Sequence, residues 1–201
     1  MKLYITRHGQ TKWNIETRLQ GWNDSDLTQK GKQDASALAS RLADVNFDHI
    51  YSSTQKRARE TAEIIKSDRN IDITELEDLR EIGFGQWEGM TMKDIQDNYK
   101  GEFDVYLKKP HLYKPILNGE SYDEIFDRVN RALKEIIKNG GDNILIVSHG
   151  VTIKILTAIV KDISREDLYE IGISKGTSLN ICQVNEDGIE FILEGDTSHI
   201  S

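Results

Sequence analysis

Short apolar runs alternate along this chain with longer segments in which hydrophobic residues recur at every third or fourth position. The strand-like runs read KLYITR, FDHIYSS, IDITEL and NILIVS, and helical patterns or polar loops follow them. This alternation is typical of an α/β fold with a mainly parallel sheet. We therefore predict three layers, in which a central sheet is flanked by helices.

Two of the expected helices carry start or stop signals. Thr28 precedes one helical pattern and is a plausible cap for it. Ser121 and Glu124 have the spacing of a capping box ahead of a long apolar stripe, and Gly140 ends that stripe. We expect helices to begin at both places.

Two segments depart from the alternation. Residues 91–120 begin with a helical pattern from Thr91 and then contain both prolines, so we expect a helical and irregular excursion, which would roof the candidate site described below. Near the end, SLNICQV and IEFIL flank NEDG, which predicts a hairpin. We find no repeat or linker, and we predict one domain over residues 1–201.

The balance of charged residues argues against some classes of binding partner. The 201 residues include 26 Lys and Arg against 34 Asp and Glu, a net charge of −8. An acidic surface argues against a general binder of nucleic acid or of anionic membranes. The single cysteine, Cys182, cannot form an intrachain disulfide, and no secretory signal or membrane-spanning run is evident. We expect a cytoplasmic protein.

Three of the predicted strands end in residues that are unusual for a buried strand. Arg7 and His8 follow the first strand, Arg57 lies shortly after the second, and His149 follows NILIVS. In open α/β sheets, ligands bind beyond the carboxyl ends of the strands. If these strands are parallel neighbours, two histidines and two arginines share one crevice.

This set of side chains suits a phosphoryl group. The guanidinium groups of Arg7 and Arg57 offer planar forks of charged donors. Gly9 and Gly150 allow the backbone to approach closely, and helices beginning near Arg57 and Gly150 would present free N–H groups. A neutral histidine can attack phosphorus and form a phosphohistidine that water hydrolyses, while the second histidine stabilises charge on the equatorial oxygens.

Such a reaction also needs a proton donor for the leaving alcohol. The loop REIGFGQWEG supplies two candidates, Glu81 and Glu88. Like-charge repulsion from a bound phosphate dianion favours the protonated form of a carboxyl group, which makes it a competent acid. The scheme requires no metal ion and no cofactor, and it predicts a mildly acidic pH optimum because the donor must hold its proton.

These motifs occur in an order that resembles the histidine phosphatase superfamily, also called phosphoglycerate mutase-like. TRHGQTKWN resembles its RHG signature, and LQGWNDSDLTQKG follows at the usual place. YSSTQKRARETA resembles the second arginine segment, LREIGFGQWEG the acid loop, and VSHG the second histidine. The resemblance spans nearly the whole chain.

The resemblance implies a role for each candidate residue. His8 becomes the phosphorylated nucleophile and Glu81 the proton donor, which leaves Glu88 as a structural residue beside Trp87. The expected catalytic and substrate-binding set is completed by Arg7, Asn14, Gln20, Gly21, Arg57, His149 and Gly150.

Two chemistries compete within this superfamily. Cofactor-dependent mutases resemble RHGES and carry a tyrosine soon after the acidic residue, whereas this chain has RHGQT and Phe84. PHLYKP and EGDTSHI are similar to the broad-specificity branch of the small bacterial phosphatases. We therefore expect a phosphomonoesterase of the histidine acid type that acts on small organic phosphates. The alternatives are a mutase-type isomerase, an alpha-ribazole phosphatase and a catalytically silent phosphoryl-binding protein.

Overall fold

The computed structural model describes residues 1–115 and 117–200. Its helices pack around a central β-sheet. Residue 116 of the predicted excursion and residue 201 of the predicted domain lie outside this description. The sheet has six strands in the order β3-β2-β4-β1-β5-β6. Their bounds are β1 Lys2–Arg7, β2 His49–Ser53, β3 Ile73–Leu76, β4 Asn143–Ser148, β5 Leu179–Asn185 and β6 Gly188–Asp196.

The strands that carry the candidate chemistry are parallel neighbours. Strand β4 lies between β1 and β2 and runs parallel to both. In this register Arg7 is paired with Ser148, and Ser52 with Val147, so the three carboxyl ends meet at one edge. Strands β5 and β6 form the predicted antiparallel hairpin. The predicted sheet and the juxtaposition of its strand ends are confirmed.

The hydrophobic sequence of β4 explains its central place. Ile144, Leu145, Ile146 and Val147 are all fully buried, which requires cover on both faces of the strand. Successive side chains point to opposite faces. Ile144 and Ile146 join one apolar cluster, while Leu145 and Val147 join the other. A strand of this composition is stable only inside a three-layer fold.

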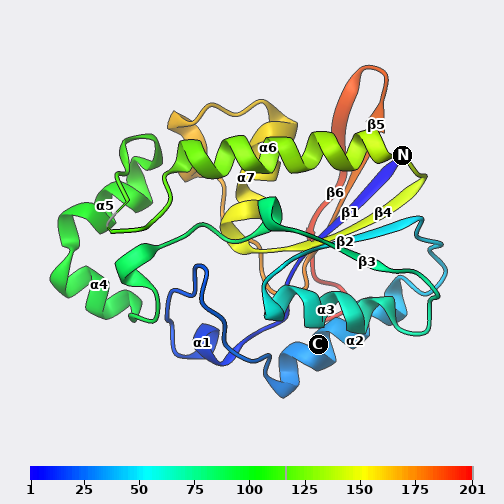
Figure 1. Ribbon diagram of the computed structural model, residues 1–201, viewed down its shortest axis with the longest axis horizontal. Helices are drawn as coiled ribbons and strands as arrows, with labels where there is room; N and C mark the ends of the chain where they lie inside the picture. Colours follow the sequence, from blue (N-terminus) through cyan, green and yellow to red (C-terminus); the bar gives the residue numbers. More distant parts are fainter. Residues whose placement is uncertain (116, 201) are drawn as a thin grey trace.

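Helices cover both faces of the sheet, as Figure 1 shows. Helices α6 (Tyr122–Asn139) and α7 (Gly150–Lys161) lie on one face, and α2 (Gln29–Arg41) and α3 (Lys56–Lys66) on the other. Their apolar residues belong to the two clusters that sandwich β4. This arrangement is the predicted three-layer α/β class.

The predicted helix signals are confirmed. The Thr28 side chain accepts a hydrogen bond from a backbone N–H of α2. Ser121 and Glu124 form the predicted capping box at the start of α6, and Gly140 ends the helix with a φ of +78°. Strands β2 and β3 are shorter than the apolar runs FDHIYSS and IDITEL, because only their later residues pair in the sheet.

The excursion lies beyond the carboxyl edge of the sheet, at the left of Figure 1. It contains α4 (Met92–Asn98), α5 (Lys100–Lys108) and the 3-10 turn η3 (Pro110–Leu112). Helix α1 (Lys12–Ile15) lies at the lower left of Figure 1, below the excursion. Short 3-10 turns also occur at η1 Glu77–Leu79, η2 Gly85–Trp87 and η4 Glu166–Glu170.

Aromatic packing holds the excursion to the rest of the fold. The Trp87 ring lies 5.9 Å from Phe103, 6.1 Å from Tyr106 and 5.7 Å from Tyr113, measured between centroids. Trp87 is fully buried in this cluster, and its edge-to-face contacts with Phe103 and Tyr106 add to the free energy gained from burying the rings. The roof over the strand ends is therefore a packed element of the core.

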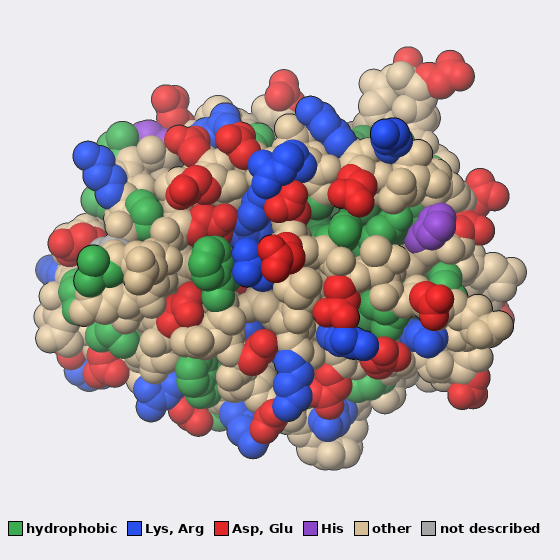
Figure 2. All heavy atoms as spheres, viewed as in Figure 1, with side chains coloured by type: hydrophobic (Ala, Val, Ile, Leu, Met, Phe, Trp, Pro, Cys, Tyr) green, Lys and Arg blue, Asp and Glu red, His purple; other side chains and the backbone are tan. Residues whose placement is uncertain are grey.

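Acidic and basic side chains are interspersed over the face shown in Figure 2. The net charge of −8 is thus not gathered into one patch on this face. Within the described residues, no helix is long and apolar enough to cross a lipid bilayer.

Because β4 is buried on both faces, we expect shorter side chains at Ile146 to lower the stability in steps. Replacing Ile146 with Val should lower the free energy of unfolding by about 0.5–1.5 kcal/mol, and replacing it with Ala by about 2–5 kcal/mol. The reason is the lost burial together with the cavity left between two packed layers. Urea denaturation measures both changes.

The control is Ile192→Ala on β6, because this side chain is 53% exposed. Its effect should stay within about 0.5 kcal/mol. Equal losses at Ile146 and Ile192 would contradict the assignment of β4 to the core.

Candidate active site

His8 lies immediately beyond β1 and is 2% exposed. Its backbone N–H donates to the Ser148 carbonyl at 2.9 Å, which extends the pairing of β1 with β4 by one residue. The ring Nδ1 lies 2.8 Å from the Gly9 carbonyl oxygen. A carbonyl can only accept, so Nδ1 carries the proton and Nε2 keeps its lone pair. The geometry is compatible with the nucleophilic role predicted for His8, which stays a prediction.

His149 approaches His8 from the neighbouring strand. It follows β4 directly and is fully buried at the start of α7. The two imidazole rings lie 5.2 Å apart between centroids, at an angle of 57°. Neither ring nitrogen of His149 has a hydrogen-bond partner among the described residues. Buried polar atoms are normally paired, so these nitrogens are available to a ligand.

Arg57, at the start of α3, brings its guanidinium group to the same place. Its Nε donates to Nε2 of His8 at 3.3 Å. Its other nitrogens donate to the carbonyl oxygens of Asn23 at 2.6 Å and Gly21 at 2.9 Å, and to Oδ1 of Asp24 at 2.7 Å. These bonds fix a charged group that is only 1% exposed. The loop after α1 thus orients Arg57 toward the histidine.

Arg7 is the second cation of the site. Its Nη1 donates to the Ser174 carbonyl at 2.8 Å, whereas its Nε is buried without a partner among the described residues. Gly150 makes room beside it, because a Cβ there would lie 3.6 Å from Cζ of Arg7 and 2.8 Å from Cγ2 of Ile173. A free donor on a buried guanidinium group suits an anionic ligand.

The two histidines are held in their neutral forms. Burial, followed by the charges of Arg57 and Arg7, places the pKa of His8 well below its ordinary value of 6.5. Burial, followed by the charge of Arg57, does the same to the pKa of His149. Desolvation and nearby positive charge both disfavour an imidazolium ion. The nucleophilic lone pair is therefore present at neutral pH.

The Glu81 carboxyl group is bound to the amino end of α7. Its Oε1 accepts from the N–H groups of Ile82 at 3.0 Å, Val151 at 3.1 Å and Thr152 at 3.3 Å. Its Oε2 receives only a second contact from Val151, at 3.2 Å. Oε2 is thus the less occupied oxygen and the one better placed to exchange a proton with a ligand.

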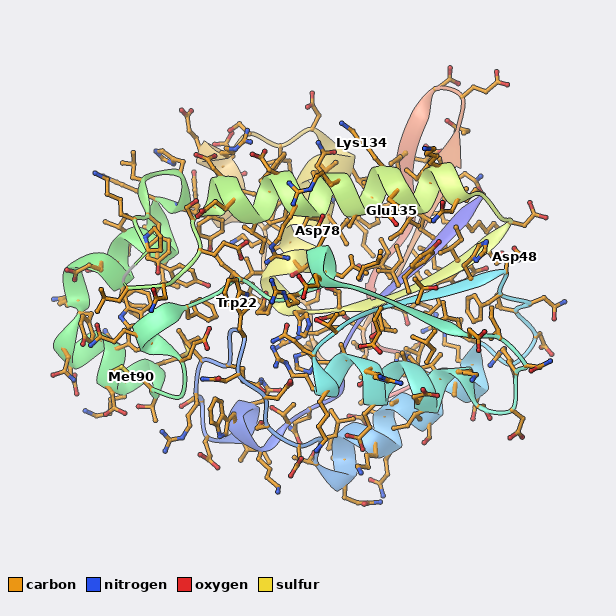
Figure 3. All side chains as sticks on the ribbon, in the orientation of Figure 1. Trp22, Asp48, Asp78, Met90, Lys134 and Glu135 are labelled. Atoms are coloured by element: carbon orange, nitrogen blue, oxygen red, sulfur yellow. The ribbon has the colours of Figure 1, made fainter. Side chains whose placement is uncertain are left out.

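Backbone and side-chain contacts also fix the loop around Glu81. Gln55 accepts from the Glu81 N–H at 2.8 Å and donates to the Gly21 carbonyl at 2.6 Å. The indole N–H of Trp22 donates to the Glu81 carbonyl at 2.9 Å. Figure 3 labels Trp22 beside the segment that runs from β3 toward α4. One buried glutamine therefore connects the Arg57 side of the site to the Glu81 side.

Glu88 has a different position from Glu81. Its Oε1 accepts from the N–H groups of Trp22 at 2.8 Å and Phe84 at 3.1 Å, and its side chain does not line the cavity described below. Gly21 packs against it with a φ of +52°, and a Cβ at Gly21 would lie 2.2 Å from that oxygen. Glu88 thus connects the loop of Trp22 to the loop of Phe84, which agrees with the structural role expected for it.

The structure corrects two expectations about the surroundings of the phosphate. The amino end of α3 is occupied by Asp24, which accepts from the N–H of Lys56 at 3.0 Å, and Val151 and Thr152 of α7 donate to Glu81. These N–H groups are not free, so the prediction that they face the phosphate is wrong. Carboxylates of the chain itself fill the positions where helix dipoles favour negative charge.

Gly9 has a packing role that the sequence did not indicate. A Cβ there would lie 2.6 Å from the Gly31 carbonyl oxygen, so the residue lets α2 approach the loop after β1. Its N–H donates to Oγ1 of Thr61 at 3.0 Å. Close approach was predicted for Gly9, but the approaching group is the chain's own backbone.

A cavity of about 340 Å³ lies over the strand ends. The predicted residues that line it are Arg7, His8, Asn14, Gln20, Gly21, Arg57, Glu81 and Gly150. His149 adjoins it through the ring of His8. The wall away from these groups is mostly apolar and comprises Leu19, Phe84, Met92, Tyr106, Leu107, Val151 and Ile173. The excursion supplies three of those residues, as expected for a roof.

Sequence reasoning missed the residues that hold Arg57 and Glu81 in place. Asp24 binds Arg57, and Gln55 joins Gly21 to Glu81. Asp24 lies in a polar loop where an acidic residue is common, so the sequence does not indicate that it binds Arg57. Gln55 stands in the segment YSSTQKRARETA next to charged neighbours, and its burial is visible only in three dimensions.

Comparison with known proteins agrees with this geometry. Residues 3–197 match the model of the histidine phosphatase superfamily, branch 1. The chain belongs to the histidine phosphatase superfamily, which confirms the resemblance seen in its motifs. No group of three His, Cys, Asp or Glu side chains arranged to hold a metal ion occurs in the described part of the chain.

Three relatives show the range within this family. The structure of Bacillus stearothermophilus YhfR has a TM-score of 0.95 and 44% identity, and the match covers 100% of this chain and 99% of that one. Phosphoserine phosphatase 1 of Hydrogenobacter thermophilus is 30% identical over 86% of this chain and 82% of its own length. Probable phosphoglycerate mutase GpmB of Citrobacter koseri is 37% identical over 80% of this chain and 74% of its own length. The chain is thus similar to phosphatases and mutases.

The electrostatics of the site predict an unusual histidine titration. In wild-type protein, the His8 imidazole should stay neutral from neutral pH to well below 6.5. Replacing Arg57 with Gln removes a charge that lies 3.3 Å from Nε2, so the pKa of His8 should rise. Heteronuclear NMR of the imidazole nitrogens measures both titrations.

The matched control is Arg59→Gln on the same helix. The Arg59 side chain is 53% exposed and pairs with Glu75, so its loss should leave the pKa of His8 where it was. A wild-type midpoint at or above 6.5, or equal shifts in the two variants, would contradict the described site.

Proposed function

We propose that this protein is a phosphomonoesterase that hydrolyses small organic phosphate esters through a phosphohistidine at His8. One observation carries the proposal. The lone pair of His8 Nε2, which accepts a hydrogen bond from Arg57, faces a cavity that is also lined by Arg7 and Glu81, and the neutral imidazole of His149 lies beside the His8 ring. These are the groups that a covalent phosphoryl transfer requires, namely a nucleophile, charge stabilisation and a proton donor.

The first step transfers the phosphoryl group to the protein. Nε2 of His8 attacks phosphorus, the P–N bond forms, and the bond from phosphorus to the ester oxygen breaks. Glu81 gives a proton to that oxygen, which leaves as an alcohol. Arg7, Arg57 and His149 stabilise the charge on the equatorial oxygens, which the transition state spreads over three atoms.

The second step returns the enzyme to its starting state. Glu81, now ionised, accepts a proton from water, and the water oxygen attacks phosphorus. The P–N bond breaks, inorganic phosphate leaves, and His8 regains its lone pair. The hydrogen bond from Nδ1 to the Gly9 carbonyl keeps the ring in one orientation through both steps.

The cavity wall favours hydrolysis over isomerisation. A mutase must hold a second anionic group on its substrate while the phosphoryl group moves. Besides Arg7 and Arg57, the only cation among the described residues that line this cavity is Arg18, whose Nε already donates to Glu16 at 2.6 Å. The remaining wall is largely apolar, which suits the leaving group of a simple ester. The relatives include both a phosphatase and a probable mutase, so the choice of hydrolysis rests on the cavity wall.

Replacing His8 with Ala should lower kcat by at least about 10⁴-fold, because the variant has no nucleophile. Phosphate release is measured with a panel of esters that includes phosphoserine, 3-phosphoglycerate and alpha-ribazole phosphate. The matched control is His111→Ala, an exposed histidine of the excursion, which should keep wild-type rates. A chelator should leave wild-type turnover intact.

Turnover retained by the His8→Ala variant would contradict the proposal. A wild-type protein that isomerises 3-phosphoglycerate faster than it releases phosphate would instead favour the mutase. Absence of turnover on every ester tried would favour a phosphoryl-binding protein.

The pH dependence of kcat/KM should lack an acid limb at the ordinary histidine pKa. Because the pKa of His8 lies well below 6.5, the nucleophile is not protonated when the pH falls from 7 to about 5.5. The donor carboxyl must hold its proton when the ester oxygen leaves, so we expect a mildly acidic optimum.

The profile is recorded with an ester whose own ionisation is measured separately by phosphorus NMR. A loss of kcat/KM with a midpoint near 6.5 would show that His8 titrates as it does in water. An optimum well above neutrality would count against a carboxylic acid as the donor.

A further inference from the structure

A buried ion pair lies directly behind the loop that carries Glu81. Nε and Nη2 of Arg128, on α6, donate to the two carboxylate oxygens of Glu120 at 2.6 and 2.7 Å. The two side chains are only 7% and 9% exposed. No other ion pair within residues 1–115 and 117–200 has both partners buried to this degree. A bidentate pair of this kind has a fixed geometry.

The same guanidinium group binds the loop backbone. Its Nη1 donates to the carbonyl oxygens of Asp78 at 2.9 Å and Arg80 at 2.7 Å, and its Nη2 donates to that of Glu81 at 3.0 Å. Glu120 holds the other side of the loop. It accepts from the Gly83 N–H at 3.2 Å, and its own N–H donates to the Gly83 carbonyl at 2.7 Å.

This loop has no regular secondary structure of its own to hold it. Residues 80–84 lie between the 3-10 turns η1 and η2, outside any strand or helix. The backbone position of Glu81 therefore depends on partners from elsewhere in the chain. Its carbonyl accepts from two of them, Trp22 at 2.9 Å and Arg128 at 3.0 Å. In Figure 3, the labelled Trp22 and Asp78 flank this segment.

We propose that Arg128, with Glu120 as its partner, is a positioning residue for the proton donor Glu81. Neither residue lines the cavity, so the pair acts through the loop and does not touch the substrate. Proton transfer needs the donor within hydrogen-bond reach of the leaving oxygen, and a small displacement of Glu81 removes that reach. The inference rests on the proposed function, because it assigns the pair to that reaction.

Two esters with different leaving groups distinguish a displaced proton donor from a loss of folded protein. An alkoxide is a poor leaving group, so hydrolysis of an alkyl phosphate depends on the proton that Glu81 supplies. The p-nitrophenolate anion departs without that proton. A misplaced donor therefore slows the first reaction selectively, whereas a loss of folded protein slows both reactions equally. The ratio of kcat/KM for the two esters is the readout, because it reports steps up to the first P–O cleavage.

The experiment uses glycerol 2-phosphate and p-nitrophenyl phosphate with the Arg128→Lys variant. Lysine keeps a positive charge beside Glu120, but one ammonium group cannot reproduce the planar fork that binds three carbonyls. We expect kcat/KM for glycerol 2-phosphate to fall at least about tenfold, and that for p-nitrophenyl phosphate to change by less than about threefold. Glu120→Gln, which keeps the side-chain size, should shift the ratio in the same direction.

The matched control is Arg131→Lys, on the same helix. Arg131 forms a bidentate pair with Asp78 at 3.1 Å, but its side chain is 65% exposed and it gives no hydrogen bond to Glu81. Its replacement should leave the ratio at the wild-type value. Thermal unfolding of every variant shows that it is folded at the assay temperature. Glu81→Gln gives the ratio that complete loss of the donor produces.

Two results would overturn the inference. Equal losses of kcat/KM on both esters in Arg128→Lys and Glu120→Gln would assign the pair to stability alone. Wild-type kcat/KM on both esters in both variants would show that Glu81 keeps its position without the pair. If Glu81→Gln itself leaves the ratio unchanged, Glu81 is not the donor, and the failure lies with the proposed function as well. A ratio shifted in Glu81→Gln but not in the Arg128 and Glu120 variants overturns the positioning role only.

Discussion

The site depends on one constraint, which is that three parallel strands end at the same edge of the sheet. Strands β1 and β4 pair residue by residue up to Arg7 and Ser148, so the next residue of each strand is a histidine. Strand β2 ends beside them and leads to Arg57. The apolar sequence of β4 places this strand in the middle of the sheet, because its four aliphatic residues need cover on both faces. The chemistry is therefore set by the packing of the sheet.

Buried cations at this edge are held in a way that leaves them available to an anion. Backbone carbonyls of Gly21, Asn23 and Ser174 accept most of the hydrogen bonds from the two guanidinium groups. Carbonyl oxygens orient an arginine without neutralising its charge. Arg57 has a carboxylate partner as well, Asp24 at 2.7 Å, whereas the hydrogen-bond partner of Arg7 among the described residues is a carbonyl alone. The same concentration of positive charge, together with burial, keeps the two imidazoles neutral. One arrangement thus supplies both the positive charge and the neutral imidazole that the proposed reaction requires.

The features that could be predicted from the sequence are those set by residues close together in the chain. Consecutive aliphatics in NILIV, the caps at Thr28 and Ser121, and the order of the motifs led to the fold class, the strand ends and the family. The parts that depend on distant residues were not predictable. Arg128 contacts the Glu81 loop from 47 positions away, and nothing in its helical surroundings distinguishes it from an exposed arginine. The role of Gly9 was also missed, because the backbone of Gly31 approaches it only after the chain folds.

The central claim is that His8 forms a covalent bond to phosphorus during turnover. Its most direct test is a rapid alkaline quench of the enzyme during hydrolysis of a phosphate ester, followed by digestion and mass spectrometry. The account predicts an acid-labile phosphate on the peptide that contains His8, formed and lost at rates compatible with kcat. Turnover without any phosphorylated peptide, or with the phosphate on His149, would contradict it.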